Sequence, residues 1–444
     1  MKSNVKLDRQ KELETADVHA LSHDGRGIAS IGNKTTFISG ALPGETVSYQ
    51  LTQKRSHYNE AELIQVLTPS PERITPPCQH FGTCGGCSLQ HMSIQSQIAL
   101  KQQTLLDQLK HFGQVTPETW LAPLSAHDIG YRRKARLGVK FVIKKDKLLV
   151  GFREKSSNYL ADLEECKVLH PEVGQRFLKL RALITSLTLY RHIPQIEVAI
   201  GDTDVALVFR HLESISEADK EKLICFGKKH HFQIYLQPNS PAKITKLWPQ
   251  DENERLTYTL PDDDLEFLFH PLDFTQINLE MNRLMVKQAI HLLDLKPNDA
   301  VLDLFCGIGN FTLPIARHVN RVVGIEGSAE MVTRAKDNAH HNGIQHAEFY
   351  AANLQELVPQ AAWMKNQYDK ILLDPPRAGA KEMLPYFKQF AAKKIVYVSC
   401  NPATLARDAG ELVHQQGYQL KQAGIMNMFP HTSHIEAMAV FDKN

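Results

Sequence analysis

The stretch that decides the fold is 299-DAVLDLFCGIGNFTL-313. An apolar run over residues 299–305 predicts a buried strand, and Gly307 and Gly309 form a tight turn with no side chain in the way. The residues from Asn310 onward begin a helix. A strand, a glycine turn and a helix in this order are typical of an open α/β sheet, in which ligands bind beyond the carboxyl ends of the strands.

The same alternation of strands and helices continues to the end of the chain. Ser328 caps a predicted helix that Gly343 ends. Further strands are predicted at residues 321–326, 346–351, 369–374, 394–399 and 436–441. Strictly alternating elements predict a doubly wound, mostly parallel sheet.

Two further regions precede this sheet. Residues 1–70 contain short β-like runs separated by turn signals, which predicts a small β-barrel. Residues 71–275 mix strand and helix patterns and hold three clustered cysteines. The predicted architecture is therefore multidomain α/β, with an OB-like N-terminal barrel at 1–70, a central α+β domain at 71–275 and a Rossmann-like domain at 276–444.

The composition is that of an ordinary globular protein. Hydrophobic residues make up 43% and charged residues 23% of 444 positions, and the net charge is +2. The N-terminus lacks the apolar core of a secretory signal, and no apolar run is long enough for a membrane span. We therefore expect a cytoplasmic protein, whose clustered cysteines are metal ligands or catalytic groups and not disulfides.

The local charge is more informative than the net charge. Residues 131–155 hold ten Lys and Arg residues against two acidic ones, on a pattern typical of strands. A solvated hairpin face is one interpretation of this basic patch. Contact with a phosphate backbone is the favoured one, because such a density of one sign repels itself unless a polyanion offsets it.

Polar residues at the strand ends predict a nucleoside pocket. Glu326 ends the strand after the glycine turn, where a carboxylate can accept hydrogen bonds from both hydroxyls of a ribose. Thr312 replaces the third glycine of the dinucleotide fingerprint, which gives less reason to expect a pyrophosphate there. An adenosine without a pyrophosphate suggests S-adenosyl-L-methionine. Asp303 either structures the loop or faces the methionine moiety. Other candidate contacts at this edge are Phe305, Asn310 and Asn353.

Two later strand ends supply reactive groups. Asp374 ends one strand in ILLDPPRAG, and Cys400 ends the next in VSCNP. Cys400 is either a small core residue or a nucleophile, and its place at the edge that carries the pocket favours the nucleophile. Methylation at C5 of a pyrimidine needs a thiolate that adds to C6 and so makes C5 nucleophilic. Glu436, which begins the last strand, is the candidate base for the C5 proton.

These motifs resemble those of the RNA uracil-C5 methyltransferases that use S-adenosyl-L-methionine. The resemblance rests on FTQIN (274–278), LDLFCGIGNFTL (302–313), Glu326, DPPRAG (374–379), SCNPATLARD (399–408) and HTSHIE (431–436). It implies that Cys400 is the nucleophile and that Glu436 is the proton acceptor. It also implies cofactor contacts at Gln276, Phe305, Asn310, Glu326, Asn353 and Asp374.

A cysteine cluster marks the central region. Cys78, Cys84 and Cys87 lie in the spacing C-x5-C-x2-C beside glycines, and Cys166 is the best candidate for a fourth ligand. Four thiolates hold either zinc or an iron–sulfur cluster, and the spacing does not separate the two. The resemblance implies a [4Fe-4S] cluster, because the branch of the family acting on bacterial 23S rRNA carries this pattern. That branch also has an N-terminal TRAM barrel, which the first region resembles.

The resemblance predicts an enzyme that methylates C5 of one uridine of 23S rRNA. We also expect a monomer that binds neither DNA nor membranes. One alternative is a uracil-C5 methyltransferase that acts on another 23S rRNA uridine or on tRNA. Another is a non-catalytic rRNA-binding assembly factor with a vestigial pocket. The presence of Cys400, Glu436 and Glu326 argues against the assembly factor.

Overall fold

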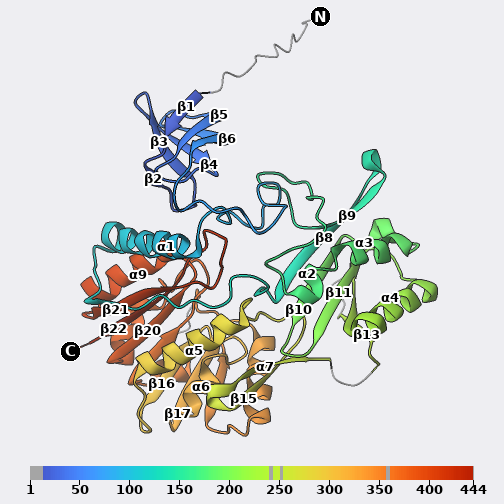
Figure 1. Cartoon of the computed structure of the whole chain (residues 1–444). Coiled ribbons are helices and arrows are strands. Elements are labelled where there is room, and N and C mark those ends of the chain that lie inside the picture. The colour runs from blue at the N-terminus through green and yellow to red at the C-terminus, as the bar shows by residue number, and fades with distance from the viewer. Residues whose placement is uncertain (1–13, 240–243, 251–253, 357–360, 444) are drawn as a thin grey trace, which may run out of the picture. The chain divides into compact units, whose positions relative to one another are not determined.

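The computed structural model describes residues 14–239, 244–250, 254–356 and 361–443 (Figure 1). The chain divides into two compact units, which are described separately below. The first consists of Met1–Gly82, Cys87–Lys101 and His431–Ser433, and the second of Thr83–Gly86, Gln102–Pro430 and His434–Asn444. None of the helices in the described ranges combines the length and the apolar character needed to cross a bilayer.

A six-stranded sheet makes up most of the first unit. Its strands follow the order β1-β5-β6-β4-β3-β2, and all neighbours are antiparallel except β4 and β6. Small apolar side chains and the ring of Tyr49 fill its interior. The prediction of short strands separated by turns is confirmed. The strands are β1 (Glu14–Asp17), β2 (Ala20–Leu21), β3 (Gly27–Ile31), β4 (Lys34–Ser39), β5 (Thr46–Lys54) and β6 (Tyr58–Thr68).

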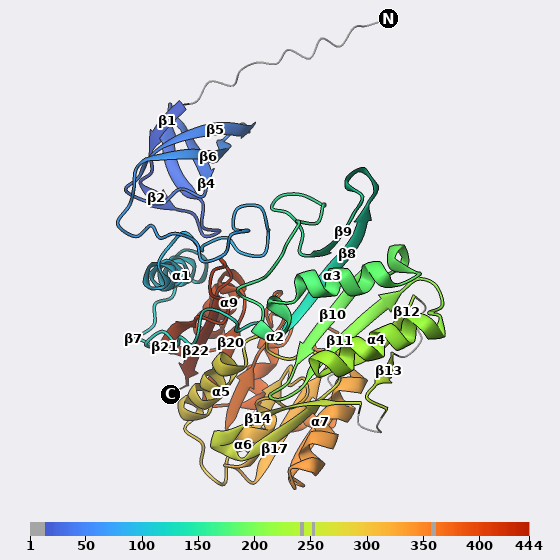
Figure 2. The same ribbon diagram turned by 45° about the vertical axis from the view of Figure 1, so that its right-hand side comes forward.

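A second six-stranded sheet lies in the second unit, in the order β13-β12-β11-β10-β8-β9. The strands are β8 (Lys134–Val142), β9 (Lys147–Gly151), β10 (Gln195–Ile200), β11 (Val205–His211), β12 (Phe232–Pro238) and β13 (Thr245–Trp248). One apolar core joins this sheet to the helices α3 (Phe177–Ser186) and α4 (Glu217–His230). Both views show the β8–β9 ribbon extending beyond the rest of its sheet (Figures 1 and 2).

The third sheet has eight strands in the order β18-β17-β16-β19-β20-β22-β21-β7. Its strands are parallel from β18 to β20, whereas β22 is antiparallel to both β20 and β21. The predicted doubly wound, mostly parallel sheet is therefore confirmed. The strands are β7 (Thr119–Trp120), β16 (Ala300–Leu304), β17 (Arg321–Glu326), β18 (Ala347–Ala351), β19 (Lys370–Leu373), β20 (Lys394–Ser399), β21 (Gln419–Met426) and β22 (Glu436–Asp442).

Helices and one hairpin complete the second unit. The hairpin β14 (Leu256–Leu260) and β15 (Leu265–Phe269) shares an apolar core with α5 and with the eight-stranded sheet. Three of the helices around this sheet begin at capping residues: Asn278, Ser328 and Asn401 each accept a backbone N–H of the first turn. The remaining helices are α1 (Ile94–Gln108), α2 (Pro171–Gly174), α5 (Leu279–Leu293), α6 (Thr312–Ala316), α7 (Ala329–His341), α8 (Phe387–Phe390) and α9 (Pro402–His414).

The division into three domains at 1–70, 71–275 and 276–444 remains a prediction. Within the second unit, a single core runs from β11 and β12 through the β14–β15 hairpin into the eight-stranded sheet. This continuity places the central sheet and the sheet with the candidate pocket in one compact body, so that residues from both can line the same site.

Candidate active site

The carboxyl ends of β16, β17, β19 and β20 border a cavity of about 1110 Å³. Parallel strands end at one edge of a sheet, which is why loops distant in sequence meet here. The volume exceeds the roughly 300–1,000 Å³ usual for small-molecule pockets, so the cavity has room for a cofactor and a base together. The predicted cofactor and catalytic residues all lie on its wall: Gln276, Phe305, Asn310, Glu326, Asn353, Asp374, Cys400 and Glu436.

The glycine turn after β16 holds the carboxylate of Glu326 at the cavity. Phe305, Gly307 and Gly309 all have positive φ angles, of 66°, 55° and 93°. This backbone directs the N–H of Gly307 to Glu326 Oε2 at 3.1 Å, and the N–H of Ser328 bonds Oε1 at 2.9 Å. Two backbone donors therefore fix the carboxylate, and its remaining lone pairs are available for ribose hydroxyls.

Asp303 supports the turn from inside the protein. Its side chain is fully buried and accepts a hydrogen bond from the hydroxyl of Thr312, at 2.5 Å from Oδ2. Burial raises the pKa of Asp303 to about 8, so this carboxyl is largely protonated at neutral pH. Of the two roles open for Asp303, the structure favours the loop-structuring one. The position of the absent third glycine is thus occupied by a side chain that ties α6 to β16.

Asn310 is anchored by its neighbours. Its Oδ1 accepts hydrogen bonds from Tyr258 and Asn282, both at 2.9 Å, and its Nδ2 donates to Asn282 Oδ1 at 2.9 Å. One amide hydrogen is left for a ligand in the cavity. Tyr258, which no sequence motif singled out, stacks on Phe267 with the ring centroids 4.9 Å apart.

Cys400 is presented by a strand-to-helix junction. It follows β20 directly, and Asn401 caps α9 by accepting the N–H of Ala403 at 3.1 Å. Pro402 occupies the first turn of α9, where its missing N–H costs nothing. Asn401 Nδ2 also donates to the carbonyl of Arg377 at 3.0 Å, which fastens this junction to the loop after β19. The Asn-Pro pair therefore fixes the turn that carries the thiol.

The charges around Cys400 oppose ionisation of its thiol. Burial, together with the carboxyls of Glu436 and Asp374, raises the pKa of Cys400 to about 11, while Arg377 lowers it. Burial also raises the pKa of Asp374 to about 7. The pKa of Glu436 lies well above its usual value because the residue is buried near Asp374, with Arg377 acting in the opposite direction. Arg377 is therefore the cation that offsets this concentration of acidic groups.

Two side chains position the groups that surround Cys400. Gln276 Nε2 donates to Asp374 Oδ2 at 3.4 Å, which links the segment before α5 to the loop after β19. His434 Nδ1 lies 3.3 Å from Arg377 Nη2, and the His434 ring packs edge-on against Phe429. One part of the cavity wall is therefore formed by His434, Phe429 and the Arg377 side chain.

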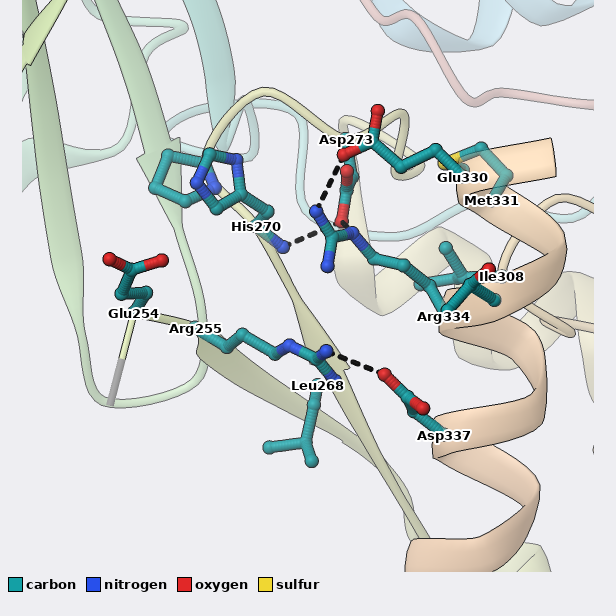
Figure 3. A network of polar contacts seen from close by, with 12 residues as sticks. Glu254, Arg255, Leu268, His270, Asp273, Ile308, Glu330, Met331, Arg334 and Asp337 are labelled. Atoms are coloured by element: carbon teal, nitrogen blue, oxygen red, sulfur yellow. Dashed lines mark hydrogen bonds and ion pairs between the residues drawn. The ribbon is translucent and has the colours of Figure 1, made fainter. Parts of the chain in front are cut away.

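A polar network fixes another part of the wall (Figure 3). Arg334 of α7 lies 2.5 Å from Asp273 Oδ2 through Nε, and 3.0 Å from Glu330 through Nη2. Asp273 Oδ2 also accepts the backbone N–H of His270 at 2.7 Å. His270, Asp273, Glu330 and Arg334 all line the cavity. Sequence reasoning did not select them, because no short motif links a residue before FTQIN to one on α7.

The central sheet also contacts the segment that contains Asp273. Lys134, at the start of β8, donates from Nζ to the carbonyls of Pro271 and Asp273. Burial lowers the pKa of Lys134 to about 8. The segment that leads to Gln276 is therefore fixed by both Arg334 and Lys134.

The predicted metal ligands divide between the two units. Cys84 and Cys166 belong to the second unit, and both border the core of the central sheet. Their sulfurs accept backbone N–H groups, from Gly86 to Cys84 and from Leu169 to Cys166, both at 3.4 Å. Cys78 and Cys87 belong to the first unit, where Cys78 N–H donates to Gln90 Oε1 at 3.1 Å. Within the described ranges, no group of three or more His, Cys, Asp or Glu side chains is placed to hold a metal ion.

Comparisons with known proteins agree with this geometry. A family model described as tRNA (Uracil-5-)-methyltransferase matches residues 93–444, and a TRAM domain model matches residues 12–64. The protein named 23S rRNA (uracil(1939)-C(5))-methyltransferase RlmD from Alcanivorax borkumensis is 52% identical over 439 residues, covering 98% of each chain. The protein of the same name from Hahella chejuensis is 51% identical over 438 residues, also covering 98% of each.

A solved structure shares the fold. It is the Pyrococcus abyssi tRNA (uracil-54, C5)-methyltransferase in complex with S-adenosyl-L-homocysteine, with a TM-score of 0.75. The two chains are 23% identical, and the match covers 96% of this chain and 100% of the other. The likeness therefore extends to nearly all of the architecture.

Replacing Arg377 by glutamine should slow the reaction of Cys400 with iodoacetamide. The change removes the cation that lowers the pKa of this thiol, and the thiolate fraction falls about tenfold for each unit by which the pKa rises. The alkylation rate at Cys400 is followed by mass spectrometry between about pH 8 and 10. Lys381→Gln, which removes an exposed cation further along the same loop, should keep the wild-type rate. Equal rates in Arg377→Gln and wild type would contradict this account.

Proposed function

The chain belongs to the tRNA (uracil-5-)-methyltransferase family, and from the names of its relatives we propose that it methylates C5 of uridine 1939 in bacterial 23S rRNA. S-adenosyl-L-methionine is the proposed methyl donor. The observation that carries the proposal is that a strand-end cysteine, two carboxyls and the Glu326 carboxylate share the wall of one cavity. A uracil-C5 methyltransferase needs these groups together: a nucleophile, a base and a cradle for adenosine.

The cofactor is proposed to bind across the ends of β16 and β17. Glu326, held by two backbone donors, accepts the ribose hydroxyls. Phe305 and Asn353 provide the walls beside the adenosine, and Gln276 and Asp374 face the methionine end. Asn310 contributes through its remaining amide hydrogen, because its other polar positions are occupied. The bound donor supplies an electrophilic methyl group.

Cys400 is the proposed nucleophile. Its thiolate adds to C6 of the uracil, and the electrons of the C5–C6 double bond move into an enolate. C5 of the enolate then takes the methyl group, and S-adenosyl-L-homocysteine is the leaving product. Because burial raises the pKa of this thiol to about 11, Cys400 must first pass its proton to water to form the thiolate. Arg377 favours that ionisation, since it is a cation that lowers this pKa.

Glu436 is the proposed base that ends the reaction. It takes the proton from C5, after which the electrons return to the ring and the Cys400 thiolate leaves C6. Burial raises the pKa of Glu436 well above its usual value, so its ionised form is a stronger proton acceptor than an exposed glutamate. Without such a base the protein would stay bonded to the methylated uracil.

The rRNA target is favoured over tRNA by the most similar relatives reported above. Both carry an rRNA-directed name and match about half of the positions along nearly the full chain. The tRNA-directed solved structure is 23% identical, which supports the fold alone. A non-catalytic assembly factor would have no need for a thiol, a buried base and a ribose acceptor in one cavity.

A [4Fe-4S] cluster on Cys78, Cys84, Cys87 and Cys166 is a further part of the proposal. Support comes from the C-x5-C-x2-C spacing and from the N–H groups directed at the sulfurs of Cys84 and Cys166. Such hydrogen bonds are known to stabilise cluster thiolates and tune their potential. When bound, the cluster would tie distant segments together; the methyl transfer itself involves no electron transfer.

RNA in which 5-fluorouracil replaces uracil should trap the protein covalently. Fluorine does not leave C5 as a proton does, so Glu436 cannot complete the reaction and the bond between Cys400 and C6 persists. The adduct is detected on a denaturing gel and located by mass spectrometry, with 23S rRNA and tRNA as competing substrates. Cys400→Ala should abolish it, whereas Cys225→Ala, which removes an exposed cysteine on α4, should not. Adducts on tRNA alone, or on Cys306, would overturn the proposal.

Glu326→Gln should weaken binding of S-adenosyl-L-methionine by about tenfold or more, because a charged acceptor of two hydroxyl groups becomes a neutral amide. The dissociation constant is measured by titration calorimetry, and the KM for RNA should not change. Glu348→Gln, on the neighbouring strand β18 and outside the cavity, is the matched control. Similar affinities for wild type and Glu326→Gln would exclude the assigned ribose contact.

Protein purified without oxygen should be brown and contain about four iron atoms and four sulfides per chain, as expected for one [4Fe-4S] cluster. Replacing any one of the four cysteines by serine should lower the iron content and the visible absorbance. Cys225→Ser should leave both at the wild-type level. A colourless protein that contains zinc would overturn the cluster assignment.

A further inference from the structure

The ten cations of residues 131–155 separate into groups with different surroundings. Three of them face backbone carbonyl groups: Arg132 donates to Lys134 O, Arg133 to Gly201 O, and Lys134 to Pro271 O. Two are ion-paired, Arg136 with Glu197 at 2.6 Å and Lys147 with Asp162 at 2.5 Å. Arg153 bonds the amide of Asn158. Fewer cations of the basic patch are therefore available to a ligand than its composition suggests, because most of them have local partners.

Four lysines are left over: Lys155 follows β9, and the other three gather near the end of the β8–β9 ribbon. Lys140, Lys144 and Lys145 are exposed, and none has a carboxylate partner among the described residues. Asp146 is the acidic residue of the turn between the strands, where its φ of 44° closes the hairpin. Ile143 stands beside these lysines with 78% of its surface exposed. A large aliphatic side chain so exposed, between lysines, has no role in the core.

An arginine stacks on the other face of the ribbon, because Phe141 and Lys140 are adjacent in β8 and their side chains point to opposite faces. The guanidinium of Arg191 lies 4.7 Å from the ring centroid of Phe141 on β8 and 5.3 Å from that of Tyr190. The two rings pack edge to face at 5.2 Å. Stacking holds Arg191 beside the ribbon without neutralising its charge. We call Lys140, Ile143, Lys144, Lys145 and Arg191 the ribbon tip; it carries four positive charges beside the single negative charge of Asp146.

The outer part of the β8–β9 ribbon extends beyond the neighbouring strand β10. β8 pairs with β10 from Lys134 to Gly138, and its outer part, from Val139 to Val142, pairs in register with β9 alone. A two-stranded ribbon that extends beyond its sheet can lie along a nucleic-acid backbone. In both Figure 1 and Figure 2 the ribbon projects beyond the rest of its sheet.

We propose that the ribbon tip binds the sugar–phosphate backbone of the RNA substrate outside the target nucleotide, with Ile143 lying against a neighbouring base or ribose. This inference rests on the proposed function, which supplies an RNA partner. Phosphate groups offset the repulsion among the four cations, and an aliphatic side chain contacts the apolar face of a base at little cost. The ribbon tip would thus provide affinity and register, and the cavity would provide the chemistry.

The test compares RNA binding by the triple variant Lys140→Ala, Lys144→Ala, Lys145→Ala with wild type. The probes are a long 23S rRNA transcript that contains uridine 1939, and a short fragment that holds this uridine and its nearest neighbours. The triple variant should bind the long transcript about tenfold to a hundredfold more weakly at moderate salt. The slope of log K against log salt concentration should become shallower by about 2 to 3 units, since each lost phosphate contact removes roughly 0.7–0.9.

The matched control is Lys179→Ala, Lys229→Ala, Lys336→Ala, which removes three exposed lysines from helices α3, α4 and α7. It should bind like wild type. Binding of the short fragment, and kcat at saturating long transcript, should be the same in all three proteins. Hydrogen exchange should show protection of residues 140–147 in wild type on adding the long transcript. Ile143→Ser should weaken binding without changing the salt slope.

The outcomes separate this inference from the proposed function. If wild type methylates the transcript and the triple variant binds it with unchanged affinity and slope, the inference fails and the function stands. If the triple variant loses affinity but wild type transfers no methyl group to the transcript, the inference stands and the function fails. If the ribbon is protected only by an acidic protein, the inference alone fails; if wild type binds no RNA, both are overturned.

Discussion

The site depends on the register between β20 and β22. These strands pair antiparallel with Ser399 opposite Ala437, so that Cys400 leaves β20 beside the point where Glu436 begins β22. A slip of one residue would turn the side chain of Glu436 to the opposite face of the sheet and away from Cys400. Such a slip is costly because both strands are buried along nearly their whole length, and every side chain would exchange its surroundings. The packing of two central strands therefore fixes the distance between the thiol and the carboxyl.

Burial then sets the charge of the groups that this register brings together. The pKa values of Asp374, Cys400 and Glu436 are all raised, and desolvation is the largest cause for each. Groups that share a poorly solvated cavity do not all ionise at neutral pH, because each negative charge raises the cost of the next. A neutral thiol is also a poor target for oxidation and alkylation while the cavity is free. A cationic methyl donor would act in the same direction as Arg377, so that filling the cavity and activating Cys400 would be linked.

The sequence predicted those parts of the fold and site that depend on local pattern. The strand ends at Glu326, Asp374 and Cys400 follow from apolar runs that stop at polar residues, and a parallel sheet must bring such ends to one edge. It did not predict β21, whose QLKQAGIM mixes polar and apolar residues and carries a register shift. The sequence also did not predict the ion pair between Asp273 and Arg334, because the two residues come from separate elements and meet only once the chain has folded. The basic patch illustrates the same limit: composition counted ten cations but not the carbonyls and carboxylates that several of them face.

Strand β8 connects the cavity wall with the ribbon tip, although in the sequence the two appear as one charged stretch. Lys134 at its start holds the carbonyls of the segment that leads to Gln276 in the cavity wall. Lys140, further along the same strand, belongs to the ribbon tip. Residues of a strand are separated by about 3.3 Å each, so the two lysines lie roughly 20 Å apart along a backbone that hydrogen bonds keep extended. A strand holds such a spacing far more rigidly than a loop would. If the ribbon tip contacts RNA, this spacing selects substrates whose backbone passes at a set distance from the flipped uridine, and sequence-independent phosphate contacts then contribute to the choice of target.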